Sequence, residues 1–137
     1  MWQIGEAAAK VGVAVSALRY WDERGLVPPA ERKAGVRWYG DEEMHRLAAV
    51  KLLQDTGMMS LDEIAVIVDG RSRGDWRAAM KSRLEEVRAQ QERLAAAQGF
   101  LEHFLRCPSD EPIVQCPRMR DYTDRALRGG AEADLAG

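Results

Sequence analysis

The sequence of 137 residues contains little that would mark a membrane, secreted or catalytic protein. No apolar run reaches the roughly 18–20 residues of a membrane span, and no basic start with an apolar signal core is present, so we expect a cytoplasmic protein without membrane contact. Only two histidines occur, and neither has an obvious nucleophile partner. Because a glycine-rich phosphate loop and a metalloprotease motif are also missing, the sequence predicts that the protein is not an enzyme.

A basic excess is missing too, since the formal net charge is −2. Non-specific nucleic-acid binders usually carry a large positive charge, so any contact with DNA must come from local clustering. Such a cluster lies between Val15 and Tyr39. Its first part is an Arg-Tyr-Trp run at residues 19–21, and its second part follows two prolines and contains Arg32, Lys33, Arg37, Trp38 and Tyr39. Two cationic elements with interleaved aromatics suit a surface that grips a phosphate backbone at two places.

The order of helix and turn signals predicts a winged helix-turn-helix. Residues 4–11 form a short helical segment before Gly12, and a second helix runs from Ser16, at its N-cap or in its first turn, to about Arg24. In this pattern the second helix enters the major groove. The prolines at 28 and 29 exclude helix, and residues 31–39 around Gly35 predict a two-stranded wing. Two packing helices are expected next, the first capped by Asp41 and ending at Gly57, the second at 61–68, opened by a Ser60–Glu63 capping box and stopping at residues 69–70.

From about Gly74 the sequence changes to a heptad repeat that extends for about 30 residues, or roughly 45 Å of helix. A lone helix cannot bury such a stripe, and the preceding half offers no partner helix, so we expect a homodimer. The alternative is a helix that folds back on its own domain. The predicted dimer seam consists of Met80, Leu84, Val87, Gln91, Leu94, Gln98, Leu101 and Leu105.

These motifs, in this order, resemble the MerR family of transcription regulators. The family's Arg-Tyr-Tyr-Glu-x-x-Gly-Leu stretch has its counterpart in Arg19-Tyr20-Trp21-Asp22 with Gly25-Leu26, and its Gly-x-Arg-x-Tyr wing in residues 35–39. Residues 57–64 resemble the family's Gly-Phe-Ser-Leu-Glu-Glu-Ile turn. The resemblance implies a mostly α-helical protein, in which a winged helix-turn-helix DNA-binding domain is followed by a long antiparallel coiled-coil dimerisation helix.

The resemblance also implies an organisation and a mechanism. We expect the DNA-binding domain at 1–72, the dimerisation helix at 73–106, a Cys-containing effector loop with a short helix at 107–128, and a disordered tail at 129–137. Such homodimers bind promoter DNA whose spacer is too long for RNA polymerase. On receiving an effector they kink and untwist the spacer, so the energy of deforming DNA supplies the switch for activation.

Seven residues are candidates for contact with DNA. On the recognition helix, the side chains opposite Leu18 are expected to face the groove, while Leu18 itself faces the core. The alternative for Tyr20 is a half-buried packing aromatic. Trp21 is expected in the core. On the wing, Arg37 and Tyr39 are expected to meet phosphates, and the other two cations are weaker candidates because wing charges are often only solvated. The set is Ser16, Arg19, Tyr20, Arg32, Lys33, Arg37 and Tyr39.

The effector is expected at Cys107 and Cys116, on a polar loop with prolines just beyond the long helix. This loop resembles that of the copper- and zinc-sensing branch of the family, which also carries a Cys pair there. Two thiolates satisfy Cu(I), whereas Zn(II) prefers four ligands. His103 shares a helix face with Cys107 if the helix persists, or is simply an exposed polar residue. The loop has an unusual length, and residues 71–79 lack the further cysteine that divalent-metal sensors carry near the start of the helix.

Three alternatives to metal sensing remain open. The two cysteines could be a thiol-redox or structural pair on the same scaffold. An organic effector could instead bind near the apolar stripe of Trp76, Phe100 and Phe104. Outside this class, the chain could be a coiled-coil metal-buffering or adaptor protein in which the basic wing is only a solvated turn.

Overall fold

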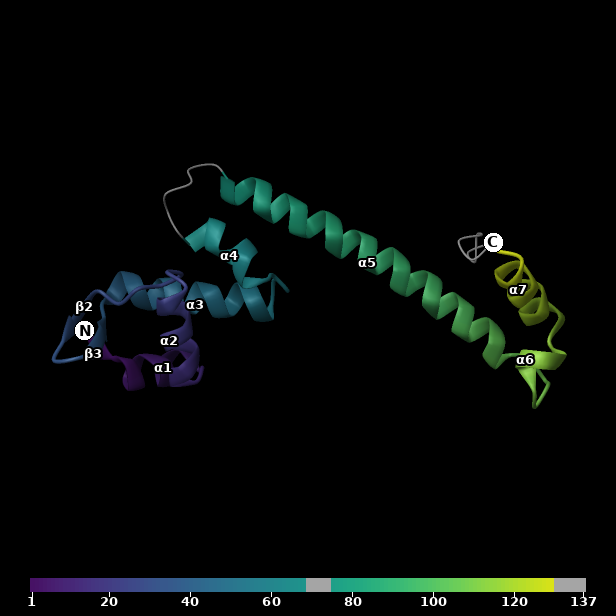
Figure 1. Cartoon of the computed structure of the whole chain (residues 1–137), viewed down its shortest axis with the longest axis horizontal. Coiled ribbons are helices and arrows are strands. Elements are labelled where there is room, and N and C mark those ends of the chain that lie inside the picture. The colour runs from purple at the N-terminus through teal and green to yellow at the C-terminus, as the bar shows by residue number, and fades with distance from the viewer. Residues whose placement is uncertain (69–74, 130–137) are drawn as a thin grey trace. The chain divides into compact units, whose positions relative to one another are not determined.

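A computed structural model describes residues 1–68 and 75–129 of the chain, and it is mostly helical with one small sheet (Figure 1). The chain divides into two compact units, Met1–Leu84 and Glu85–Gly137. The stop predicted at residues 69–70 and the disorder predicted for the tail after Gly129 lie outside the described residues. The domain boundaries proposed from the sequence stay predictions.

The helix-turn-helix consists of α1 (Ile4–Val11) and α2 (Val15–Glu23). Gly12 ends α1 in a left-handed conformation with φ of 82°, which glycine adopts without strain, and its N–H donates to the Ala8 carbonyl at 2.8 Å. Ala14 is the N-cap of α2, so Ser16 lies in the first turn of the helix and not at the cap. Arg24 is the C-cap, and Gly25 follows with φ of 71°.

The wing is a three-stranded antiparallel sheet with the order β1-β3-β2. Strands β2 (Glu31–Lys33) and β3 (Val36–Tyr39) form the predicted hairpin, in which Arg32 pairs with Arg37. Positive φ at both Ala34 and Gly35 gives the turn the backbone that suits the twist of a hairpin. Strand β1 (Trp2–Gln3), which no sequence pattern predicted, pairs with the other edge of β3.

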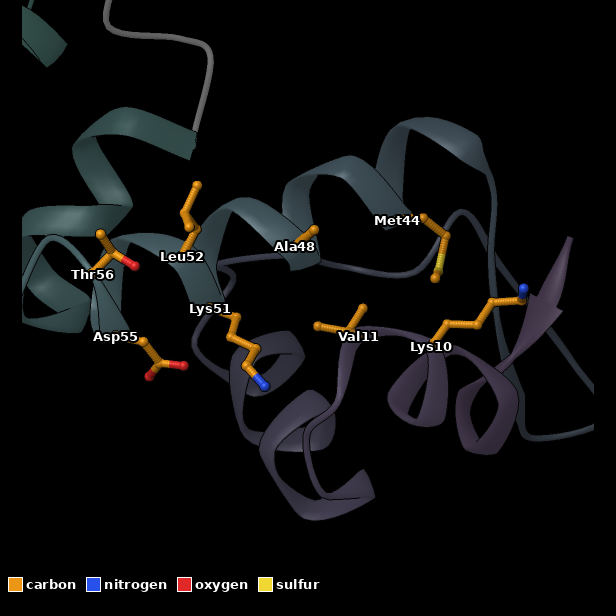
Figure 2. Close-up of a pocket in the computed structure, with 8 residues that line it drawn as sticks. All are labelled: Lys10, Val11, Met44, Ala48, Lys51, Leu52, Asp55 and Thr56. Atoms are coloured by element: carbon orange, nitrogen blue, oxygen red, sulfur yellow. The ribbon is translucent and has the colours of Figure 1, made fainter.

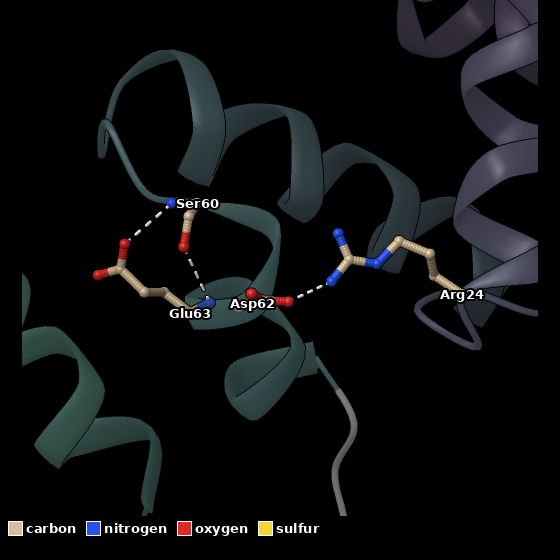
Figure 3. A network of polar contacts seen from close by, with 4 residues as sticks. All are labelled: Arg24, Ser60, Asp62 and Glu63. Carbon is tan, nitrogen blue, oxygen red and sulfur yellow. Dashed lines mark hydrogen bonds and ion pairs between the residues drawn. The ribbon is translucent and has the colours of Figure 1, made fainter.

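Helices α3 (Asp41–Asp55) and α4 (Leu61–Val68) follow the sheet. The N-cap of α3 is Gly40, whose N–H donates to the Glu43 carboxylate at 3.0 Å, so Asp41 is the first helical residue and not the predicted cap. The predicted capping box of α4 is present (Figure 3): the Ser60 N–H donates to Glu63 at 3.0 Å, and the Glu63 N–H donates to the Ser60 hydroxyl at 3.2 Å. The bond from the Ser60 backbone lowers the pKa of the Glu63 carboxyl.

The core of the first unit holds the recognition helix by its inner face. Leu18 and Trp21 of α2 are buried, as predicted, against side chains from α1, α3, α4 and β3. Each large apolar side chain buried in this way contributes about 1.5–3 kcal/mol to folding. The fully buried large side chains are Tyr39, Leu18, Leu47, Ile64, Val27 and Val50.

The remaining helices are α5 (Asp75–Leu105), α6 (Pro112–Gln115) and α7 (Pro117–Leu127). The long helix α5 and the short helix α7 were predicted, and α6 was not. No residue of α5 is buried in the single chain. Among the described residues, 1–68 and 75–129, no helix is long and apolar enough to cross a membrane.

Candidate nucleic-acid interface and effector site

The outer face of α2 carries the three predicted contacts on the recognition helix. Ser16, Arg19 and Tyr20 are all exposed, whereas Leu18 is fully buried on the opposite side. The Arg19 side chain has no ion pair or hydrogen bond with any residue that the structure describes. Its charge is therefore available to a phosphate or a base edge.

The C-terminal end of α2 is tied to α4. The Arg24 guanidinium forms an ion pair with the Asp62 carboxylate (Figure 3) and also lies over the Tyr20 ring, with 5.7 Å from its central carbon to the ring centroid. The hydrogen bond with Asp62 is the main reason why the pKa of Arg24 is raised. Sequence reasoning did not single out Arg24. Its contact with Tyr20 leaves that ring half-exposed at the outer face.

The predicted wing cations are ion-paired within the domain. Arg32 and Arg37 both bind the carboxylate of Asp22 on α2, and Lys33 lies 3.1 Å from the Glu31 carboxylate. The side chains of Arg32 and Lys33 remain 57% and 66% exposed, but that of Arg37 is only 22% exposed. The first two can therefore reach a phosphate while paired, and Arg37 mainly joins the wing to the recognition helix.

The predicted phosphate contact of Tyr39 does not fit its position in the structure. Its side chain has no exposed surface, and burial raises the pKa of its phenol. Alternate residues of a strand share a face, so Tyr39 lies on the same side of β3 as Arg37 and packs into the core. A buried ring cannot contact a phosphate, and the prediction that it does so is wrong in this fold.

A Tyr39→Phe variant tests this correction. The hydroxyl is buried and has no hydrogen-bond partner among the described residues, so its removal is expected to leave the free energy of unfolding unchanged or to raise it by about 1 kcal/mol. Urea unfolding measures the stability, and a gel shift measures DNA affinity, which should not change. A tenfold loss of affinity in a fully folded variant would return Tyr39 to the interface.

A pocket of about 300 Å³ lies between α1 and α3 (Figure 2). The Lys51 ammonium at its edge donates to the Gly12 carbonyl at 2.8 Å, so it caps the C-terminal end of α1. The pocket contains no cysteine or aromatic side chain, and its lining is Lys10, Val11, Met44, Ala48, Lys51, Leu52, Asp55 and Thr56.

The two cysteines lie together in the second unit. Cys116 is the buried N-cap of α7, and the half-buried Cys107 hydrogen-bonds to it. The pKa of the Cys116 thiol is lowered, first because the Met119 N–H donates to its sulfur, and further by the Arg118 N–H and Cys107. In the part of the chain that the structure describes, no group of three or more His, Cys, Asp or Glu residues could hold a metal ion. His103 packs edge-on against Phe104, with 5.2 Å between the ring centroids, and is neither a third ligand nor fully exposed.

The aromatic stripe predicted as a site for an organic effector is divided between the two ends of α5. Phe100 packs against Phe104 and Tyr122, with ring centroids 4.7 and 5.8 Å apart. Trp76 is at the other end of α5, about 36 Å away along the helix axis at about 1.5 Å per residue. The Arg77 guanidinium lies over its ring.

A helix-turn-helix with an exposed cationic recognition face, a wing and a long appended helix defines a DNA-binding regulator of transcription. Residues 2–71 match the model of the MerR HTH family of regulatory proteins, and residues 44–104 match the family model described as MerR, DNA binding. The chain belongs to the MerR family, as its motifs predict. Members of this family are transcription regulators, which confirms that the protein is not an enzyme.

Several relatives match along most of the chain. It is 30% identical to the mercuric resistance operon regulatory protein of Bacillus cereus, over 85% of this chain and 92% of that protein. It is 33% identical to the HTH-type transcriptional regulator HmrR of Sinorhizobium medicae, over 93% and 88% of the two chains. Among solved structures, the regulator PbrR691 of Ralstonia metallidurans in complex with lead(II) is 26% identical with a TM-score of 0.66, covering 88% of this chain and 98% of that one.

Proposed function

We propose that the protein is a homodimeric activator that distorts promoter DNA when a soft metal ion binds at Cys107 and Cys116. The observation that carries the effector part of this proposal is the pair of thiols brought together at the start of α7. The cytoplasm, where promoter DNA and RNA polymerase are found, is the compartment in which this function operates.

The dimer is supported by the exposed seam of α5. Leu84, Leu94, Leu101 and Leu105 are 47%, 69%, 61% and 85% exposed in the single chain. A row of exposed leucines at heptad spacing is stable in water when a second helix covers it. A second copy of α5, running antiparallel, supplies a matching row.

Replacing Leu94 with Glu is expected to convert the dimer to a monomer, because the charge would lie in the middle of the seam. Sedimentation equilibrium measures the mass in solution. Ala96→Glu is the matched control, since it adds the same charge to an exposed position that helical spacing places away from the seam. A Leu94→Glu variant that remains dimeric would show that the seam lies elsewhere.

The two thiols fit a soft ion that accepts two ligands and fit Zn(II) poorly. Cu(I) is satisfied by two thiolates, whereas Zn(II) lacks its remaining ligands among the described residues of one chain. The N–H groups of Met119 and Arg118 stabilise negative charge on the Cys116 sulfur, so the site is prepared for a cation that binds thiolates. The mercuric regulators and the lead(II) complex among the relatives support a soft metal as effector.

The side chains around the cysteines connect the effector loop to α5. Cys116 opens α7, and Tyr122 on that helix packs against Phe100 and Phe104. Metal binding at the thiols would therefore shift α7 and alter the packing of Tyr122 against α5. At the beginning of α5, the Arg83 guanidinium lies 3.5 Å from Glu63 in the DNA-binding unit.

Activation by distortion can be tested with promoters of different spacer length. An operator is first selected from random DNA with the purified protein, and transcription is then measured with RNA polymerase. On a long spacer, the protein with Cu(I) should increase transcription. On a spacer shortened by about two base pairs, the same protein should have no effect or should inhibit, because the boxes are already aligned. Equal activation on both promoters would contradict the mechanism.

The contact between the two thiols also supports a second candidate, a thiol-redox switch on the same scaffold. The two candidates differ in their effector. A redox sensor should activate transcription with a disulfide oxidant in the absence of metal, and a metal sensor should activate with Cu(I) in the presence of a reductant.

A further inference from the structure

The recognition helix contains a buried carboxylate, that of Asp22. Its side chain is 6% exposed, and it is the one charged residue buried in the part of the chain that the structure describes. A buried carboxylate is costly unless cations and hydrogen bonds compensate it, so its partners require an explanation.

Both partners come from the wing. The Oδ2 atom of Asp22 accepts a hydrogen bond from Nη2 of Arg32 on β2 and another from Nε of Arg37 on β3, the latter at 2.6 Å. Arg32 and Arg37 are directly opposite each other in the hairpin. The Oδ2 atom of Asp22 therefore binds both strands of the wing at one paired position of the hairpin.

The bonds also determine the charge of the cluster. Two guanidinium groups surround one carboxylate, so a positive charge remains, and the exposed part of it lies on Arg32. The hydrogen bond with Asp22 raises the pKa of Arg37, so this cation keeps its charge. Without the carboxylate, two like charges would face each other across the hairpin, and the wing would lose its attachment to α2.

We propose that Asp22 is a positioning residue for DNA binding, because it fixes the wing against the recognition helix and so sets the distance between the two places where the protein grips the backbone. The proposal rests on the wing and the helix both contacting DNA. It implies that a negative charge at the interface strengthens the binding of a polyanion.

The direction in which operator affinity changes when Asp22 is neutralised distinguishes a positioning role from a purely electrostatic effect. If only net charge mattered, neutralising Asp22 would strengthen binding to every DNA, since each phosphate contact is favoured by positive charge. If Asp22 positions the wing, its neutralisation weakens binding to the operator, where helix and wing must bind in register. Binding to unrelated DNA, which tolerates many arrangements, then stays the same or becomes tighter.

The experiment uses the full chain with Asp22→Asn and compares its affinity for a selected operator and for unrelated DNA over a range of salt concentrations. We expect at least a tenfold loss of operator affinity without a loss on unrelated DNA. Hydroxyl-radical footprinting should show that protection under the wing is lost while protection by the recognition helix remains. The conservative variant Asp22→Glu should recover most of the operator affinity.

Glu23→Gln is the matched control, because it removes the same charge from the next, exposed residue of the same helix. It should bind both DNAs as tightly as the wild type or more tightly. If Asp22→Asn does not fold, Arg37→Lys replaces it: the charge is kept and the planar donor to Asp22 is lost, so a several-fold loss confined to the operator is expected.

Operator binding by Asp22→Asn at wild-type strength or above would overturn the proposal. Equal losses on both DNAs with a lowered melting temperature would overturn it as well, since they indicate general destabilisation. Failure of the wild-type protein to prefer any DNA sequence would instead contradict the assignment of helix and wing as the DNA interface.

Discussion

An Arg19→Ala variant is expected to bind its operator about 10- to 100-fold more weakly than the wild type, which corresponds to about 1–3 kcal/mol. The reason is the free guanidinium on the exposed face of α2. The other cations of the candidate interface are held by carboxylates, Arg24 by Asp62 and the two wing arginines by Asp22. Arg19 therefore offers DNA a guanidinium whose charge is not already shared with a carboxylate among the described residues.

Affinity should be measured by gel shift or fluorescence anisotropy at several salt concentrations. If Arg19 meets a phosphate, the loss is similar on all sequences and the salt slope falls by about 1, whereas a base contact gives a loss confined to the operator. Arg128→Ala is the control, because it removes the same charge from an exposed position on the second unit. An Arg19→Ala variant with wild-type affinity would show that α2 is not the recognition helix.

Replacing both cysteines with serine is expected to abolish tight Cu(I) binding and promoter induction while leaving operator affinity intact. A hydroxyl is a poor ligand for a soft cation, and these are the only two cysteines in the chain. The chain with Cys107→Ser and Cys116→Ser should therefore bind DNA in one fixed state and stop responding to the metal.

Binding is measured by titrating the reduced protein against a Cu(I)-specific chelator and by counting bound metal per chain. His103→Phe is the control: it preserves the aromatic contact with Phe104 and removes the third potential ligand. Because His103 belongs to the ring cluster, this variant should bind Cu(I) as the wild type does. Induction by metal in the double serine variant would exclude the Cys pair as the effector site.

The sequence predicted those elements that depend on local signals. The helix ends at Gly12 and Gly25, the hairpin turn at Gly35 and the Ser60–Glu63 capping box each follow from residues a few positions apart. The heptad spacing predicted α5 for the same reason. Such signals act within one turn or one hairpin, so a single sequence contains all the information they need.

The parts that were missed depend on contacts between distant segments. Strand β1 has two residues, too few for an alternating pattern, and it exists because β3 pairs with it. The attachment of Arg37 to Asp22 joins a wing to a helix, and no local pattern indicates it. The burial of Tyr39 was missed for the same reason, because the core cluster that encloses it is built from helices distant in the sequence. The contact between the two cysteines depends on α6, whose four residues carry no clear periodic signal.

The bond from Lys51 to the Gly12 carbonyl has a consequence for how this protein acquires its shape. The turn between the first two helices is closed by a side chain that comes 39 residues later, and the first strand pairs with residues 38 and 39. During synthesis, a nascent chain of about thirty residues therefore lacks the later segments that close this turn and pair with the first strand, so it is not expected to fold. The DNA-binding domain is therefore expected to fold only after α3 has been synthesised and has packed against α1. A peptide cut to the two helices alone should remain largely unfolded in circular dichroism, despite containing every side chain of the recognition face.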